Sequence, residues 1–360
     1  MHAKVDRITF SHQVALRIPM GGTLLSGGEM LPPGPDTSCR GIRFDELKHT
    51  GKRMHLRSLA VLTLAIAASF GQASGPPTLQ PDPPMQCDSC DGWNQPREPF
   101  KVFGNTYYVG MAGVSAVLIA SDAGLILVDG ALTQSAPLID ANIRTLGFKT
   151  ENIKLIVSGH AHYDHAGGIN ALQRLSGAKV ATGMKAVPAL TNGTPTPDDP
   201  QVGFAGGGFP PIRNVQGVAD GEVLRVGGLA ITAHATPGHT PGGTSWSWRS
   251  CEGARCVDVV YADSLSAVAA PGYRFTGDAT HPSIVESFRQ SIIKFGELKC
   301  DIMIGAHPFV GDLDGKMKRR AAQPTGPNPF IDGGECRALA ADAMKGLDAR
   351  VAEESGKKLR

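Results

Sequence analysis

His160-Ala161-His162-Tyr163-Asp164-His165 places four candidate metal ligands within six residues. The preceding run, Ile153-Lys154-Leu155-Ile156-Val157, is apolar and β-branched, which predicts a buried strand. The ligands therefore occupy the loop that leaves a strand end, where open α/β folds build their sites. Imidazole and carboxylate groups suit Zn²⁺, and two clustered ligand positions suit a dinuclear hydrolytic centre. A loop that is merely rich in histidine is the weaker interpretation.

Two further histidines occupy similar positions later in the chain. His239 lies in a Pro-Gly-rich turn and His307 in Gly-Ala-His-Pro, each after a short apolar run that predicts a strand. A site assembled from several loops gives this pattern in a sequence. Seven histidines follow residue 73, and the other two, His234 and His281, are predicted to be core or loop residues.

Composition restricts the classes of function that the chain can have. The 360 residues are 41% hydrophobic with a net charge of +2, which is ordinary for a globular protein with an ample core. A balanced charge argues against a polyanionic partner, so we expect no nucleic acid as substrate. A small-molecule substrate and a monomeric protein are the expectation.

Residues 54–73 have the organisation of a secretory signal peptide. A basic start precedes the apolar run Leu59–Phe70, and a small-X-small end predicts cleavage after Ala73. A membrane-spanning helix would need about 20 apolar residues, more than this run offers. We therefore expect export to the periplasm and no membrane segment in the mature form.

The rest of the chain divides around that segment. Residues 1–53 form an upstream extension, which indicates either that translation starts at Met54 or that the leader is longer than usual. Residues 74–86, rich in proline, predict a flexible N-terminal segment. Residues 87–360 predict one catalytic domain.

Six cysteines follow residue 73, and in an exported chain they predict three disulfides. Proximity in the sequence favours Cys251–Cys256 across a hairpin tip, Cys300–Cys336 between a strand and the last helix, and Cys87–Cys90. The Cys-X-X-Cys spacing of the third pair is also compatible with a redox pair or half of a zinc site. A structural role is favoured because no second Cys-X-X-Cys accompanies it.

Hydrophobic periodicity predicts strands and helices in alternating groups. Strand-like runs lie at 101–103, 106–109, 115–120, 125–129, 153–157, 178–180, 245–248, 257–261 and 301–304, and helix-like runs at 135–146, 168–175, 282–296 and 334–354. This order predicts an α+β fold of two packed sheets with helices outside on both faces and the site at their seam. The Gly- and Pro-rich residues 192–211 predict a mobile flap beside the site.

The motifs resemble the metallo-β-lactamase superfamily, whose fold is an αββα sandwich. His160–Gly168 resembles the superfamily signature. Pro237–Trp246, Tyr261–Ser266 and His307-Pro308 are similar to the third subclass of class B β-lactamases, in which no cysteine ligates the second metal. The resemblance spans about residues 87–350.

Carried over residue by residue, the resemblance implies two zinc ions. It implies that one is held by His160, His162 and His239, and the other by Asp164, His165 and His307. Ser264 and Ser266 would orient water or bind the substrate carboxylate.

The same resemblance implies an activity. A hydroxide held by two zinc ions would hydrolyse the β-lactam amide of penicillins, cephalosporins and carbapenems and so confer antibiotic resistance, with Asp164 as the catalytic proton carrier. Preference among these substrates is not predicted.

Two alternatives remain open at this stage. A thioester or lactone hydrolase of the same superfamily, similar to glyoxalase II or to quorum-lactone hydrolases, would have a bridging carboxylate at Asp263, whereas the β-lactamase interpretation requires Ser264 to face the metals. A secreted zinc-binding protein without catalysis would need a closed ligand shell, and three ligands per metal leave it open.

Overall fold

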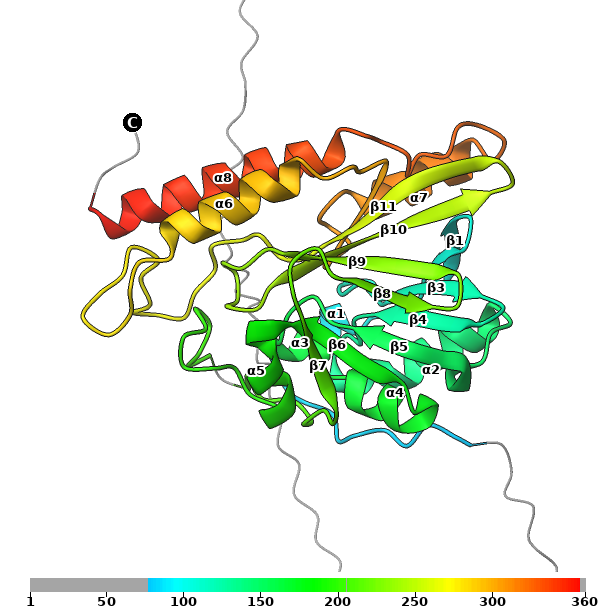
Figure 1. Cartoon of the computed structure of the whole chain (residues 1–360), viewed down its shortest axis with the longest axis horizontal. Helices are drawn as coiled ribbons and strands as arrows, with labels where there is room; N and C mark the ends of the chain where they lie inside the picture. The colour runs from blue at the N-terminus through cyan, green and yellow to red at the C-terminus, as the bar shows by residue number, and fades with distance from the viewer. Residues whose placement is uncertain (1–76, 205, 357–360) are drawn as a thin grey trace, which may run out of the picture. The chain divides into compact units, whose positions relative to one another are not determined.

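The computed structural model describes residues 77–204 and 206–356. Two β-sheets pack against each other, with helices on the outer side of each sheet (Figure 1). This arrangement confirms the expected αββα sandwich. The predicted signal peptide and upstream extension lie outside the described residues.

The first sheet has seven strands that follow one another in chain order. They are β1 (Phe100–Phe103), β2 (Thr106–Tyr108), β3 (Val117–Ser121), β4 (Gly124–Val128), β5 (Ile153–Val157), β6 (Lys179–Gly183) and β7 (Val215–Val218). The first four pair antiparallel, with two-residue turns joining β1 to β2 and β3 to β4, and β4 to β7 pair parallel. Parallel pairing needs crossover connections, which helices provide here.

The second sheet has five strands in the order β12-β11-β10-β9-β8. They are β8 (Val223–Val226), β9 (Leu229–Ala235), β10 (Thr244–Glu252), β11 (Arg255–Ala262) and β12 (Ile302–Gly305). The first four pair antiparallel, while β12 pairs parallel to β11. Strands β9, β11 and β12 therefore run in one direction, so their carboxyl ends meet at the same edge.

Helices cover both outer faces. The α-helices are α1 (Cys90–Trp93), α2 (Ala136–Thr145), α3 (Tyr163–Ala166), α4 (Ile169–Ser176), α5 (Val187–Asn192), α6 (Val285–Gly296), α7 (Leu313–Ala322) and α8 (Glu335–Glu354), and the short 3-10 helices are η1 (Thr133–Ser135), η2 (Thr150–Asn152) and η3 (Met184–Ala186). Helices α2 and α4 lie on the first sheet, while α6 and α8 lie side by side on the second (Figure 1). None of the helices among the described residues is both long and apolar enough to span a bilayer.

Alternation along the strands divides the core into layers. Side chains such as Ile126, Trp246 and Val259 fill the space between the sheets. Leu127 turns outward to the helices of the first sheet, and Val260 turns outward to those of the second. Because both faces of both sheets are covered, the strand positions are fixed, and so are the loops at the strand ends.

Three disulfides join the expected partners. Cys251 faces Cys256 directly across β10 and β11, and Cys300, just before β12, is joined to Cys336 on α8. Cys87 is joined to Cys90 at the start of α1. The N-terminal residues described also make contacts, since Asp82 pairs with Arg174 of α4 at 2.9 Å.

Candidate metal centre

Loops at the ends of three strands bring the predicted ligands together. His160 and His162 follow β5, and Asp164 and His165 lie on α3, which begins at once after this loop. His239 follows β9 and His307 follows β12. All six side chains are buried except that of His307, which is partly exposed.

Two groups of nearby ligand atoms result. One atom each from His160, His162 and His239 lies within 4.8 Å of the others, and the same holds for His160, Asp164 and His165. His307 adjoins the second group, since its Nε2 lies 3.5 Å from Oδ2 of Asp164. His160 thus lies between the two groups, although it was expected with the first set only.

Each of the five histidines has one ring nitrogen next to an oxygen outside the cluster. The pairs are His160 Nδ1 with Asp263 Oδ1 at 2.6 Å, His162 Nε2 with Asp199 Oδ1 at 3.1 Å, His165 Nδ1 with Asp129 Oδ2 at 3.2 Å, His239 Nδ1 with the Ser266 carbonyl at 3.0 Å, and His307 Nδ1 with the Gly113 carbonyl at 2.9 Å. A nitrogen that donates outward leaves the other nitrogen with a lone pair. Histidines that ligate metals have this arrangement almost without exception.

The electrostatics of the cluster also fit a bound cation. Burial and the neighbouring His165 hold the pKa of His160 well below its ordinary value, which favours the neutral ring. Burial and the nearby His162 likewise lower the pKa of His239 to about 3. Neutral imidazole is the form that binds metal.

Asp164 and His165 form the charged part of the cluster. Burial opposes charge on both, yet their mutual attraction lowers the pKa of Asp164 and raises the pKa of His165 to about 10. Among the residues that the structure describes, Nε2 of His165 has no hydrogen-bond partner, and it lies 3.3 Å from Oδ2 of Asp164. A divalent cation between these atoms would take the place of the proton, so this donor set fits zinc.

Sequence reasoning missed the carboxylates that hold the histidine rings. Asp129 follows β4 with a φ of +59° and accepts hydrogen bonds from Gly159 N at 2.7 Å and from the Tyr261 hydroxyl at 2.7 Å, besides its contact with His165. Asp199 is supplied by residues 192–211, which had been predicted only as a mobile flap. The signal available for Asp129 was its position at a strand end, the same signal that identified the ligands.

Asp263 and the two serines follow β11. Asp263 is buried against the outer nitrogen of His160 and belongs to neither group of ligand atoms among the described residues. Burial and the nearby Asp129 raise the pKa of Asp263 well above its ordinary value. Ser266 is exposed, and its Oγ lies 3.1 Å from Nδ1 of His239, while Ser264 is half-buried.

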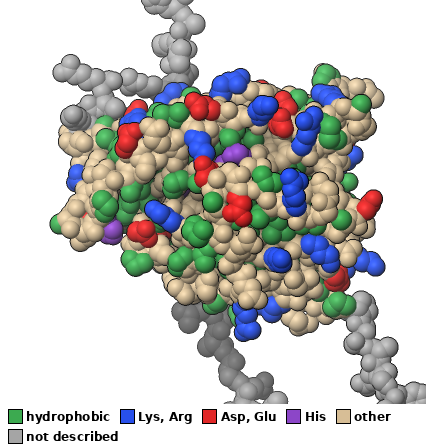
Figure 2. Space-filling view, viewed as in Figure 1, with side chains coloured by type: hydrophobic (Ala, Val, Ile, Leu, Met, Phe, Trp, Pro, Cys, Tyr) green, Lys and Arg blue, Asp and Glu red, His purple; other side chains and the backbone are tan. Residues whose placement is uncertain are grey.

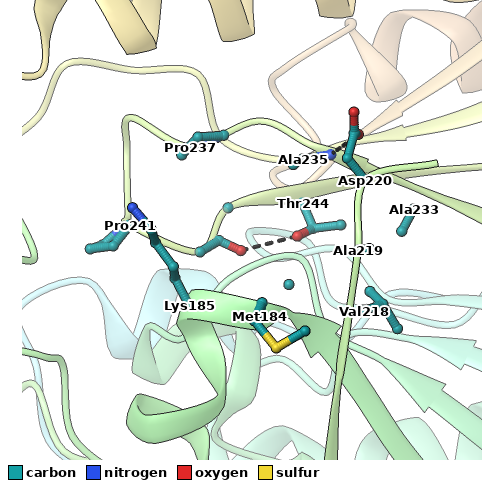
Figure 3. Close-up of a pocket in the computed structure, with 13 residues that line it drawn as sticks. Met184, Lys185, Val218, Ala219, Asp220, Ala233, Ala235, Pro237, Pro241 and Thr244 are labelled. Carbon is teal, nitrogen blue, oxygen red and sulfur yellow. Dashed lines mark hydrogen bonds between the residues drawn. The ribbon is translucent and has the colours of Figure 1, made fainter. Parts of the chain in front are cut away.

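Close backbone packing fixes the loop that carries His239. Gly238 has a φ of +150°, and a Cβ there would meet the Phe288 ring at 2.0 Å. A Cβ on Gly242 would meet Ala186 N at 2.2 Å. On its other side this loop borders a cavity of about 200 Å³, where Thr244 donates a hydrogen bond to the Gly242 carbonyl (Figure 3). Glycine is therefore needed at these positions to keep the imidazole in place.

Aromatic rings flank His307. Phe309 stacks on its ring with centroids 5.1 Å apart, and Trp93 of α1 lies at 5.4 Å. Phe309 is 75% exposed, although it is a large apolar side chain. An exposed aromatic ring beside a cluster of ligands suits contact with an apolar part of a substrate.

Residues 109–307 match the family model described as the metallo-β-lactamase superfamily, and this span includes all six clustered residues. The chain belongs to the metallo-β-lactamase superfamily. Solved structures of this superfamily resemble it over most of their length. The Rm3 metallo-β-lactamase is 45% identical with a TM-score of 0.72, over 75% of this chain and 99% of that one.

Two further structures carry the label of subclass B3 metallo-β-lactamase. MEM-A1, from a soil metagenome library, is 48% identical with a TM-score of 0.71, over 74% of this chain and 100% of that one. BJP-1 of Bradyrhizobium japonicum is 34% identical with a TM-score of 0.68, over 74% of this chain and 98% of that one. The metallo-β-lactamase fold inferred from the sequence is thus confirmed.

Proposed function

We propose that this chain is a zinc-dependent β-lactamase that opens the amide bond of β-lactam antibiotics with two zinc ions per chain. The observation that carries the proposal is the set of five histidines, each with one ring nitrogen beside an oxygen outside the cluster, so that the other nitrogen can carry the lone pair a metal needs. In His239 that second nitrogen, Nε2, also lies 3.1 Å from Nε2 of Gln201. Family membership and the similarity to subclass B3 enzymes support the choice of substrate.

We assign one zinc to His160, His162 and His239 and the other to Asp164, His165 and His307. Zinc at these positions supplies a Lewis acid for the lactam carbonyl and lowers the pKa of water to about 7. Three protein ligands for each ion leave coordination positions open, which favours catalysis over a purely structural site.

The chain's own residues position the substrate and move the proton. Asp164 is the one carboxylate among the six ligands, and we assign it the transfer of a proton from water to the departing lactam nitrogen. Ser264 and Ser266 follow β11, and we assign their hydroxyls the donation of hydrogen bonds to the substrate carboxylate. The position of Ser266 beside His239 supports this role.

Hydrolysis of a thioester or lactone is the competing function. It would require Asp263 to reach the metals, as a bridging ligand does. Its contact with the outer nitrogen of His160 favours a positioning role for Asp263, and hence the β-lactamase.

We propose that the active enzyme is a periplasmic monomer. Its domain would comprise residues 87–360, preceded by a short segment at 74–86 and a cleaved signal peptide at 54–73. Basic and acidic side chains are interspersed on the face drawn in Figure 2, which supports a small-molecule substrate and no nucleic-acid partner.

Hydrolysis by the zinc-loaded protein tests the proposal. A penicillin, a cephalosporin and a carbapenem would be compared with an acyl thioester and a lactone, each with and without a chelator. We expect β-lactam hydrolysis that a chelator abolishes and added zinc restores. Turnover of the thioester or lactone with all three β-lactams intact would transfer the assignment to the competing function.

A further inference from the structure

Asp199 is a buried carboxylate that no catalytic step above uses. It lies in the Asp199 turn, which we define as residues 196–202. Asp199 is 2% exposed, whereas the preceding Asp198 is exposed to solvent. Burial of a carboxylate is costly unless hydrogen bonds satisfy it, so its partners explain why it is there.

Those partners link the Asp199 carboxylate to one metal ligand, His162, while the Gln201 side chain of the same turn lies 3.1 Å from Nε2 of His239. Oδ1 and Oδ2 of Asp199 lie 3.1 and 3.2 Å from Nε2 of His162. Oδ1 also accepts a hydrogen bond from Gln201 N at 2.8 Å. The backbone of the turn is closed by Asp199 N donating to the Thr196 carbonyl at 2.9 Å and by Val202 N donating to the Asp199 carbonyl at 3.0 Å. The carboxylate is therefore held in place by the turn and presented to a single imidazole.

This contact determines which nitrogen of His162 carries the proton. A carboxylate accepts only, so Nε2 of His162 must donate to it, and the lone pair is then on Nδ1. With Nε2 committed to Asp199, we infer that Nδ1 is the atom His162 offers to its group with His160 and His239. The opposite tautomer would present an N–H to the metal and could not ligate it.

The three histidines of this first set include no charged ligand, unlike the second set with Asp164. We infer that Asp199 is a positioning residue that holds His162 in its ligating tautomer and adds a negative charge next to the first zinc only. The inference rests on the proposed zinc site but not on the identity of the substrate. Loss of such partners generally lowers metal affinity by about 10–100-fold.

Asp199→Asn tests the role of the charge with almost no change in shape. An asparagine amide can donate to Nε2 of His162 and so favour the tautomer that does not ligate. Asp198→Asn is the matched control, since it removes an equal charge from the exposed neighbour. Both variants and the original protein would be titrated with zinc against a chromophoric chelator, which resolves the two affinities.

We expect one of the two zinc ions to bind about 10–100-fold more weakly in Asp199→Asn. The other ion should be unaffected, which also shows that the variant is folded, and both should be unaffected in Asp198→Asn. Unchanged affinities in Asp199→Asn, or an equal loss in Asp198→Asn, would overturn the inference. A wild-type protein that binds no zinc would instead reject the proposed function.

The tautomer of His162 gives a readout that does not depend on folding of the variant. Nitrogen-15 NMR of the zinc-free wild-type protein, recorded at a pH where the His162 ring is observed to be neutral, should show the proton on Nε2 and none on Nδ1. The reverse assignment would remove the physical basis of the inference.

Discussion

At the residue scale, the two ring nitrogens of each histidine in the site have different roles. One contacts an oxygen that orients the ring, and the other is assigned to a metal. Outward contacts to Asp263, Asp199 and Asp129 orient three of the rings, and backbone carbonyls orient the other two. Rings held in this way keep their geometry before a metal arrives, so less ordering is required on binding.

A matched pair of histidine variants tests which rings are ligands. We predict that His162→Ala lowers hydrolysis by more than about 100-fold. Loss of a residue that only holds a metal ligand in place already lowers metal affinity or activity by about 10–100-fold. His234→Ala is the control, because its Nε2 contacts Ser247 Oγ at 2.7 Å and it lies outside the cluster. The zinc content and the kcat/KM of each variant are measured and compared with those of the wild type. Equal activity of the two variants would argue against the ligand assignment.

Phe309 provides a test of substrate contact. Because its exposed ring lies against His307, we predict that Phe309→Ala raises KM about fivefold for a β-lactam with an apolar substituent, which corresponds to about 1 kcal/mol of lost apolar contact. We expect kcat to stay within about twofold, as for binding shared by ground and transition states. Steady-state kinetics measure both constants, and a fall in kcat at constant KM would contradict the assignment.

The sequence predicted the ligands because they are reactive residue types at strand ends. It did not identify Asp199 or Asp129 as their partners. These carboxylates lie 37 and 36 residues from the histidines they contact, and only the folded chain brings them together. Asp199 was harder still to identify because the Gly- and Pro-rich sequence around it predicts only a loop.

At the element scale, α7 (Leu313–Ala322) was not predicted. Its sequence, LDGKMKRRAA, contains a glycine and few apolar residues, so hydrophobic periodicity is weak. Tertiary contacts stabilise it instead: Lys316 is buried and lies 2.5 Å from Glu335, while Arg320 donates to the Val102 carbonyl. Strongly periodic segments such as 153–157 and 285–296 were located because their pattern alone carries the information.

The last turn of α8 is expected to be sensitive to pH. The Glu354 carboxylate accepts hydrogen bonds from Phe275 N at 2.9 Å and Thr276 N at 2.8 Å, and it pairs with Arg350. Although burial raises the pKa of Glu354, these partners hold it below its ordinary value. A lowered pKa stabilises the fold above the unfolded-state pKa of about 4.3, and this contribution is lost as the pH falls through the folded-state pKa.

We therefore predict that Glu354→Gln lowers the free energy of unfolding by about 1–2 kcal/mol at pH 7. The difference from wild type should shrink as the pH falls below about 4. Urea denaturation at several pH values measures it, with Glu353→Gln as the control because that side chain is 75% exposed. If the difference in free energy of unfolding between Glu354→Gln and wild type grew on acidification, the pKa of Glu354 would be raised by folding and not lowered.

The disulfides give a second prediction at this scale. Cys300 and Cys336 are 36 residues apart, and Cys251 and Cys256 are five apart. By the chain-entropy relation, replacing the first pair with serine should cost about 3–4 kcal/mol of stability and replacing the second about 2 kcal/mol. Denaturant unfolding of the two double variants compares them. A larger loss for the shorter loop would mean that native-state contacts outweigh loop entropy.

At the scale of the whole molecule, the two sheets bring ligands from distant parts of the chain to one place. The first sheet supplies His160, His162, Asp164 and His165, and the second supplies His239 and His307. Neither sheet alone provides a complete set for both ions. Sequence patterns predicted the two-sheet arrangement, but the strand order and the register required the folded chain.

The central claim is that these six side chains bind two zinc ions. Anomalous diffraction at the zinc edge from crystals of the zinc-loaded protein tests it most directly. The account predicts two peaks in each chain, one contacted by His160, His162 and His239 and the other by Asp164, His165 and His307. A single peak, or a peak contacted by Asp263, would contradict it.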